Sequence, residues 1–251
     1  MIIGSCRYGH GAFMRISRAV VLLLAMIWVI PVTSRASEFV FARLVYGGGY
    51  DGWPRWQADW PEAETHFSSG LERLTSIEVA DEDVLVRMAG TDVFDYPWIY
   101  VVEVGFLRFS ADEISQLREY LLRGGFLMVD DFHGQAEWQQ FEYIMAQVFP
   151  ERDLEELESD SEIFHVMYDL AEREQIPGIR AWLNNQTWEK GGRYPHWRGI
   201  VDDQGRVMVA VNFNQDLGDA WEHADDARYP ARLTTQAYRL GINYVVYAMT
   251  H

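Results

Sequence analysis

The sequence predicts a single α/β domain built on a mainly parallel β-sheet. Between residues 39 and 150, short apolar segments alternate with amphipathic ones, which is the pattern of right-handed βαβ units. Residues 98–104 (WIYVVEV) are apolar on both faces, as central strands of parallel sheets are. The chain has 251 residues, 49% of them hydrophobic, which suits one globular core.

The first elements follow from composition and spacing. Residues 39–46 (FVFARLVY) are rich in β-branched and aromatic side chains, which predicts a strand ended by glycines. A helix is expected from Pro61, and short strands at 77–79 and 84–88. The apolar residues with helical spacing in that helix are Ala63, Phe67, Leu71 and Leu74.

The middle of the chain repeats the alternation. Ser110 and Glu113 form a capping-box pattern that predicts the start of a helix, and glycines 124 and 125 predict its end. Residues 126–130 (FLMVD) form the next expected strand. A helix follows, whose inward residues are Trp138, Phe141, Ile144 and Val148.

The last third is less regular. Residues 151–196 are expected to form an irregular insertion with one or two short elements. Two strands around a DDQG turn follow, and a final helix is expected from about Ala231 to Met249.

The N-terminus has the plan of a secretory signal peptide. From Met14, the better start codon, two arginines precede an apolar run over residues 19–30 and a small-x-small ending at Ala36. We therefore expect residues 1–36 to be removed and 37–251 to form the mature, exported domain, in the periplasm or cell envelope. The alternative is an uncleaved signal anchor, which would be its one link to a membrane.

Charge and cysteine content exclude several classes of protein. The net charge is −17, and residues 37–251 hold 17 basic and 38 acidic residues, a net charge of −21. Such a surface repels phosphate backbones and anionic lipid headgroups, so nucleic-acid binding is not expected. The single cysteine, Cys6, precedes the cleavage point, which excludes disulfides, thiolate nucleophiles and cysteine metal ligands from the mature domain.

Three sequence blocks resemble a known family. Residues 39–53 (FVFARLVYGGGYDGW), 96–134 (YPWIYVVEVGFLRFSADEISQLREYLLRGGFLMVDDFHG), and 212–222 with 239–249 (NFNQDLGDAWE, RLGINYVVYAM) resemble the bacterial family catalogued as domain of unknown function 4159. That resemblance implies a class I glutamine amidotransferase-like fold, a flavodoxin-like three-layer sandwich, and implies no activity. Amidotransferase chemistry needs a nucleophilic cysteine at a strand-to-helix turn. The corresponding turn here offers Asp130, Asp131, Phe132 and His133, so that activity is excluded.

The turn after the strand at 126–130 supplies the main candidate site. Parallel strands present their carboxyl ends at one edge, so Asp130, Asp131 and His133 could meet Asp51 from the first loop. Asp216 and Asp219, with Glu222 and His223 nearby, could add further ligands. Carboxylates with an imidazole can bind a metal or divide acid and base roles. The alternative is that the aspartates cap helices or bond turn amides, with His133 a surface residue.

Successive side chains alternate in direction, so only one of Asp130 and Asp131 can face a crevice. We expect that aspartate to lie near His133, and the other to bond amides in the turn toward Gly134, where glycine permits a left-handed backbone.

The first rim loop offers two weaker patterns. Gly47, Gly49 and Gly52 satisfy G-x-G-x-x-G, but two prolines and three tryptophans follow instead of a helix, which disfavours nucleotide binding. Trp53 is a candidate ligand-binding residue, with Trp56 and Trp60 beside it. The alternative, that these tryptophans pack against the sheet edge, remains open.

Two functions stay open at this point. The first is an exported domain that binds an unidentified ligand or envelope protein at the carboxyl-end rim of the sheet. The second is a hydrolase that uses Asp130, Asp131 and His133, with or without a metal. The sequence identifies no cofactor, metal or substrate for either.

Export predicts a specific mature N-terminus. Mass spectrometry of the protein recovered from the cell envelope should find a chain that begins close to Ser37. Full-length protein in the cytoplasm would contradict this prediction.

Overall fold

The structure is a computed structural model and describes residues 1, 4, 38–48 and 52–251. The chain divides into two units, Met1–Arg35 and Ala36–His251. The second unit contains every helix and strand of the described residues. The predicted signal segment, residues 1–36, and Asp51 lie outside the described residues, apart from residues 1 and 4. Within the described part of the chain, no helix combines the length and the apolar character needed to span a membrane.

The fold is α/β, with a seven-stranded sheet in the order β2-β1-β3-β4-β7-β6-β5 among the described residues. Neighbouring strands from β2 to β7 pair in parallel, whereas β6 and β5 add antiparallel pairs at one edge. The strands are β1 (Ala42–Leu44), β2 (Val84–Val86), β3 (Trp98–Val102), β4 (Phe126–Asp130), β5 (Glu155–Glu156), β6 (His196–Val201) and β7 (Val207–Phe213).

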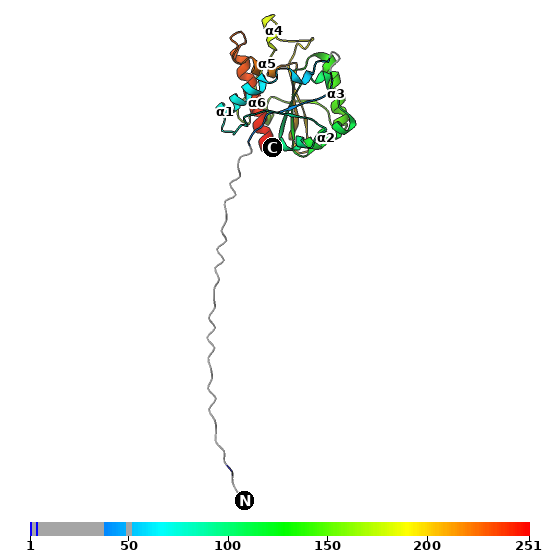
Figure 1. Ribbon diagram of the computed structural model, residues 1–251, viewed down its shortest axis with the longest axis vertical. Helices are drawn as coiled ribbons and strands as arrows, with labels where there is room; N and C mark the ends of the chain where they lie inside the picture. Colours follow the sequence, from blue (N-terminus) through cyan, green and yellow to red (C-terminus); the bar gives the residue numbers. More distant parts are fainter. Residues whose placement is uncertain (2–3, 5–37, 49–51) are drawn as a thin grey trace. The chain divides into compact units, whose positions relative to one another are not determined.

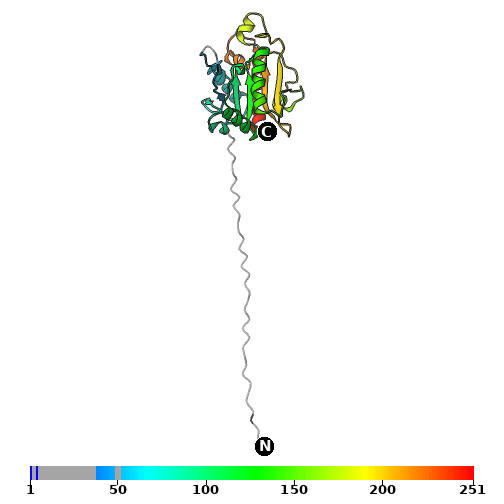
Figure 2. The same ribbon diagram turned by 90° about the vertical axis from the view of Figure 1, so that its right-hand side faces the viewer.

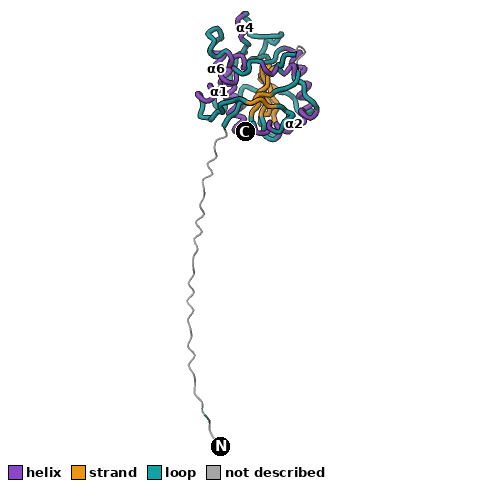
Figure 3. Tube along the Cα trace, viewed as in Figure 1, coloured by secondary structure: helices purple, strands orange, loops and turns teal. Residues whose placement is uncertain are grey.

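Helices cover both faces of the sheet, with α1, α5 and α6 on one face and α2 and α3 on the other (Figure 1). Figure 2 shows the green helix, α3, in front of one face of the sheet. Figure 3 shows the strands enclosed by helices and loops. The α-helices are α1 (Glu62–Leu74), α2 (Ala111–Leu122), α3 (Gly134–Val148), α4 (Ile179–Leu183), α5 (Leu217–Glu222) and α6 (Ala231–Thr250). Short 3-10 helices are η1 (Arg55–Gln57), η2 (Asp92–Asp95), η3 (Val104–Phe106) and η4 (Glu162–Phe164).

The central strands form two separate cores because their side chains alternate. In β3, Trp98 and Tyr100 pack in the core under α1, α5 and α6. Ile99 and Val101 pack in the core under α2 and α3. All five residues of β3 are buried, as expected for a strand covered on both faces.

Most predicted elements are confirmed. The capping box is present, because the Ser110 side chain accepts from the Glu113 N–H and the Glu113 carboxylate accepts from the Ser110 N–H. Three details of the prediction are wrong. Leu74, the last residue of α1, is 53% exposed because the helix ends as it leaves the core. In the segment 77–79, only Val79 pairs, in an isolated bridge with Phe39, and α5 was not expected as a separate helix.

One buried ion pair holds the loop after β1. Arg43 in the middle of β1 pairs with Glu64 of α1, and both side chains are almost fully buried. The Arg43 Nη1 also donates to the carbonyl oxygens of Trp56 and Ala58, each at 2.9 Å. The guanidinium therefore joins the sheet, α1 and the loop at residues 53–61.

Removing the acid of this pair should be strongly destabilising. Glu64→Ala leaves the Arg43 charge buried without its counter-ion, and we expect a loss of about 3–5 kcal/mol in the free energy of unfolding. Urea denaturation monitored by circular dichroism measures it. The matched control, Glu151→Ala, breaks the exposed pair with Arg118 and should barely move the midpoint. Equal effects of the two substitutions would contradict the role given to Arg43.

Candidate functional site

The loops that follow β1, β3 and β4 meet at one end of the sheet. Gly47 pairs with Arg108 in an isolated antiparallel bridge, and the Glu103 N–H donates to the Asp131 carbonyl oxygen at 3.0 Å. These contacts confirm that the three loops share the carboxyl-end rim of the parallel strands. Figure 1 shows α4 and α5 at this end of the domain, and the C-terminus at the opposite end.

A cleft of about 730 Å³ opens at this rim. Its walls come from the loop after β1, the ends of β3 and β4, and the segments around α4 and α5. Among the described residues, seven carboxylate side chains line it: Asp59, Glu103, Asp131, Glu189, Asp216, Asp219 and Glu222. The basic side chains along the same cleft are Arg55, Arg180, Arg228 and His223. Acidic groups therefore outnumber basic ones at this surface.

Asp130 ends β4 and does not line the cleft. Its side chain is fully buried, and Oδ2 accepts three hydrogen bonds, from the Tyr100 hydroxyl at 2.9 Å and from the N–H groups of Leu217 and Gly218 at 2.8 and 3.0 Å. Burial, with the charge of Asp131, raises the pKa of Asp130 to about 7. Asp130 thus anchors the start of α5 to the sheet.

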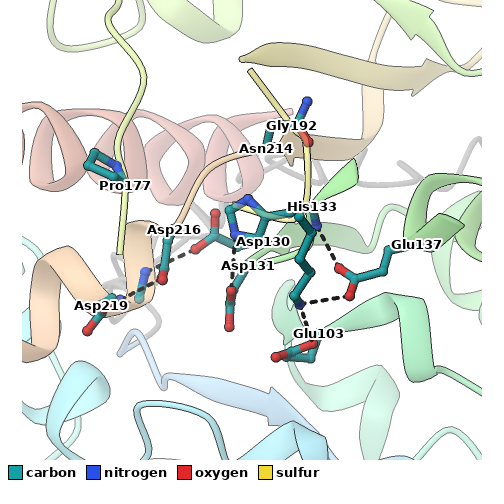
Figure 4. Close-up of polar contacts among 12 residues, drawn as sticks. Glu103, Asp130, Asp131, His133, Glu137, Pro177, Gly192, Asn214, Asp216 and Asp219 are labelled. Atoms are coloured by element: carbon teal, nitrogen blue, oxygen red, sulfur yellow. Dashed lines mark hydrogen bonds and ion pairs between the residues drawn. The ribbon is translucent and has the colours of Figure 1, made fainter. Parts of the chain in front are cut away.

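Asp131 is the aspartate that faces the cleft, and His133 lies beside it (Figure 4). The backbone of Asp131 is left-handed, with φ 47°, which turns its side chain away from that of Asp130. The His133 Nε2 is 3.4 Å from the Asp131 Oδ1. Burial opposes protonation of His133, but the Asp131 carboxylate outweighs it, so the pKa of the imidazole is raised.

The sequence-based expectation for these two aspartates is therefore half right. One faces the cleft next to His133, and the other bonds backbone amides. Those amides belong to α5, however, and not to the turn toward Gly134. The physical reason is that the Asp130 side chain lies on the same face of the sheet as that of Tyr100. This is the face covered by α5, so the carboxylate of Asp130 meets the α5 amides. His133, expected as a surface residue in the alternative interpretation, is buried.

The start of α3 closes one side of the site. Gly134 has φ 73°, as expected for a glycine in this turn, and its N–H donates to the Asn214 Oδ1 at 2.9 Å. Glu137 accepts from the His133 N–H at 2.7 Å and pairs with the Lys190 Nζ at 2.7 Å. Lys190, the one lysine of the sequence, also lies 3.6 Å from Glu103. The Lys190 charge thus balances two carboxylates at the edge of the cleft.

Helix α5 positions two more of the candidate site residues that were predicted from the sequence. Asp216 is its N-cap and accepts from the Asp219 N–H at 2.9 Å. Asp219 Oδ2 accepts from the Ile179 N–H at 2.6 Å and so fixes the start of α4. Burial, with repulsion from Asp131, raises the pKa of Asp216 well above its usual range. Burial also raises the pKa of Asp219 to about 6.

Three cleft carboxylates were missed from the sequence: Asp59, Glu103 and Glu189. Glu103 has a signal that could have found it, because it is the polar residue at the end of an apolar strand. Burial, with repulsion from Asp131, raises its pKa to about 7. Asp59 and Glu189 lie in irregular segments without periodicity, where no sequence pattern marks them. Burial and the charge of Asp131 raise the pKa of Asp59 well above its usual range.

The tryptophans of the first rim loop were expected either to bind a ligand or to pack against the sheet edge, and the structure differs from one tryptophan to the next. Trp53 is 56% exposed and lines the cleft. Trp56 and Trp60 are half-buried against each other, with ring centroids 5.9 Å apart, and the Trp60 Nε1 donates to the Asp83 Oδ2 at 3.0 Å. Packing therefore accounts for Trp56 and Trp60.

Two groups of side chains in the described residues have metal-ligand geometry. Asp131, His133 and Asp216 each offer one ligand atom, and these atoms lie within 4.8 Å of one another. Asp219, Glu222 and His223 satisfy the same condition. The first group unites three of the residues predicted from sequence.

Comparison with known proteins gives a family without an assigned activity. The family model described as domain of unknown function (DUF4159) matches residues 40–249. Among the described residues, that range includes every helix and strand except the last residue of α6, Thr250. No curated protein matches the chain.

The buried carboxylates predict an unusual dependence of stability on pH. In the folded state, the pKa values of Asp130 and Glu103 are raised to about 7 and that of Asp219 to about 6. At these three groups the folded protein therefore binds more protons than the unfolded chain between about pH 4 and pH 7, and their contribution to stability falls as the pH rises through this window. In buffer with EDTA, the melting temperature should be higher at about pH 5 than at about pH 7.5. Each kcal/mol gained in the free energy of unfolding should raise it by about 2–4 °C.

Asp131→Asn is the matched control for this effect. Asparagine tolerates the left-handed backbone, and the substitution removes a charge that raises the pKa of all three groups. Its melting temperature should change less with pH. A wild-type protein that loses stability toward pH 5 would contradict the prediction.

Proposed function

The chain belongs to the DUF4159 family, whose description assigns no activity, and we propose that it is an exported domain that binds a cationic ligand in the rim cleft. The observation that carries this proposal is the excess of carboxylates in the cleft, several of them partly desolvated. Like charges that are buried together repel each other, and a cation bound among them would relieve that repulsion. Export is supported by the basic, apolar and small-residue plan of residues 14–36.

The topology supports a ligand site at this position. The five parallel strands run in the order β2-β1-β3-β4-β7, which matches the flavodoxin-like order 2-1-3-4-5 and supports the proposed class I glutamine amidotransferase-like sandwich. In such sheets, ligands bind where the strand order reverses, between the first and third strands. The cleft is lined by residues that follow β1 and β3, among them Trp53, Asp59 and Glu103.

Hydrolysis is the second candidate, and one observation favours it. Asp131 has a left-handed backbone in the turn between β4 and α3, the position at which many α/β hydrolases carry their nucleophile on a strained turn. An aspartate there could act as a nucleophile or a base beside His133. Hydrolysis of nitrophenyl esters, phosphates or glycosides that disappears in Asp131→Asn would favour this candidate over simple binding.

Ligand charge can be tested without knowing the natural ligand. In buffer with EDTA, we expect spermidine and arginine to raise the melting temperature, and citrate and glutamate to leave it unchanged, because the cleft is acidic. Isothermal titration calorimetry then compares two charge reversals. Glu222→Arg, in the cleft, should weaken spermidine binding about tenfold, equivalent to about 1.4 kcal/mol.

The matched control is Glu158→Arg, an exposed residue that does not line the cleft. It changes the net charge equally, so it should leave the affinity within about twofold. Equal weakening by both reversals, or equal binding of citrate and spermidine, would contradict the proposal.

A further inference from the structure

We propose that the floor of the cleft is a binding site for one divalent transition-metal ion, held by Asp131, His133 and Asp216. This inference deepens the proposed function, since it assigns a specific inorganic cation to the same cleft. The three residues come from the turn after β4 and from the N-cap of α5. Figure 4 shows Asp131, His133 and Asp216 close together around Asp130, with a dashed line between His133 and Asp131.

The spacing of the three side chains fits a metal ion. One oxygen of each aspartate and one ring nitrogen of His133 lie within 4.8 Å of one another. An ion about 2.0–2.2 Å from each ligand needs ligand atoms about 3–4 Å apart, which small side-chain rotations can supply. The Asp216 Oδ1 is engaged by the Asp219 N–H, so Oδ2 is the oxygen available to a metal.

The state of His133 is a second, independent observation. Its side chain is only 2% exposed, yet neither ring nitrogen has a hydrogen-bond partner among the described residues. Buried polar atoms are rarely left in this state, because they give up their bonds to water without a replacement. The Asp131 Oδ1 lies 3.4 Å from Nε2, which is an ion-pair contact, whereas Nδ1 has no polar partner of any kind among the described residues. A metal between the imidazole and the two carboxylates would satisfy a ring nitrogen and balance both charges.

The ligand set indicates which ions suit the site. One imidazole and two carboxylates, with no cysteine in residues 37–251, favour Zn²⁺, for which imidazole is a common ligand, or Mn²⁺, which accepts carboxylates, over Ca²⁺, which prefers six or more oxygens. Asp131 and Asp216 both line the cleft. The remaining coordination positions would therefore face the cleft, open to a donor atom of a ligand or to water.

The neighbouring group of Asp219, Glu222 and His223 does not carry the same inference. Asp219 already uses Oδ2 for the Ile179 N–H and places Oδ1 3.0 Å from the His223 Nε2. All three side chains are partly exposed, so water can satisfy them. This group is instead the competing site that the experiment must distinguish.

The test is calorimetric titration of the EDTA-treated and dialysed protein with Zn²⁺ and with Mn²⁺, without any organic ligand. We expect one ion per chain for at least one of the metals. Asp131→Asn and Asp216→Asn should each weaken binding about tenfold or more. Asparagine suits the left-handed backbone at position 131 and preserves an N-cap oxygen at position 216, so both variants should fold. Glu158→Gln, far from the ligands in sequence and absent from the cleft lining, should leave metal affinity unchanged.

A spectroscopic measurement tests the histidine without a substitution. The ¹⁵N resonance of one His133 ring nitrogen should shift on addition of Zn²⁺, as expected for coordination. The inference is overturned if neither metal binds in a one-to-one ratio. It is equally overturned if Glu222→Gln weakens binding while Asp131→Asn does not, because the ion then belongs to the other group.

The outcomes separate this inference from the proposed function. Binding of spermidine in EDTA without any metal binding would refute the metal site and leave the cationic ligand standing. Metal binding without any organic cation binding would support the metal site and refute an organic cation as the ligand of the cleft.

Discussion

The buried carboxylate of Asp130 is the interaction on which the site depends. A single oxygen at the end of β4 accepts hydrogen bonds from β3, through Tyr100, and from the first two amides of α5. These three donors and the start of a helix reduce the cost of burying an acidic group, but they do not cancel it, because burial still raises the pKa of Asp130 to about 7. Since α5 is held at this point, its N-cap Asp216 comes to lie next to Asp131, and its Asp219 reaches the start of α4.

The same anchoring concentrates negative charge instead of dispersing it. Asp131 contributes to the raised pKa values of Asp59, Glu103, Asp130, Asp216 and Asp219. A domain selected only for stability would separate these groups, because each carboxylate makes the ionisation of the others less favourable. Clusters of carboxylates with raised pKa values are common at binding and catalytic sites. The proposals for a cationic ligand and for a metal ion both start from the crowding of carboxylates in this cleft.

Local sequence patterns predicted most of the scaffold. The capping box at Ser110, the apolar strands β3 and β4, and the inward face of α3 were readable because each depends on neighbours within a few residues. Candidate residues Asp131, His133, Asp216 and Asp219 were found from their position after strands or beside an expected turn. Asp59 and Glu189 were not, because they lie in irregular loops whose path is decided by distant contacts such as those of Arg43 with Trp56 and Ala58.

By itself, the sequence predicted from strand alternation that Asp130 and Asp131 point in different directions, and the left-handed backbone of Asp131, one residue beyond the end of β4, produces this result. The sequence also determined that residues 37–251 contain no cysteine that could act as a nucleophile. Only the tertiary structure decided which aspartate faces the cleft. The amides that bind Asp130 lie 87 and 88 residues further along the chain, and no local rule predicts a hydrogen bond across that separation.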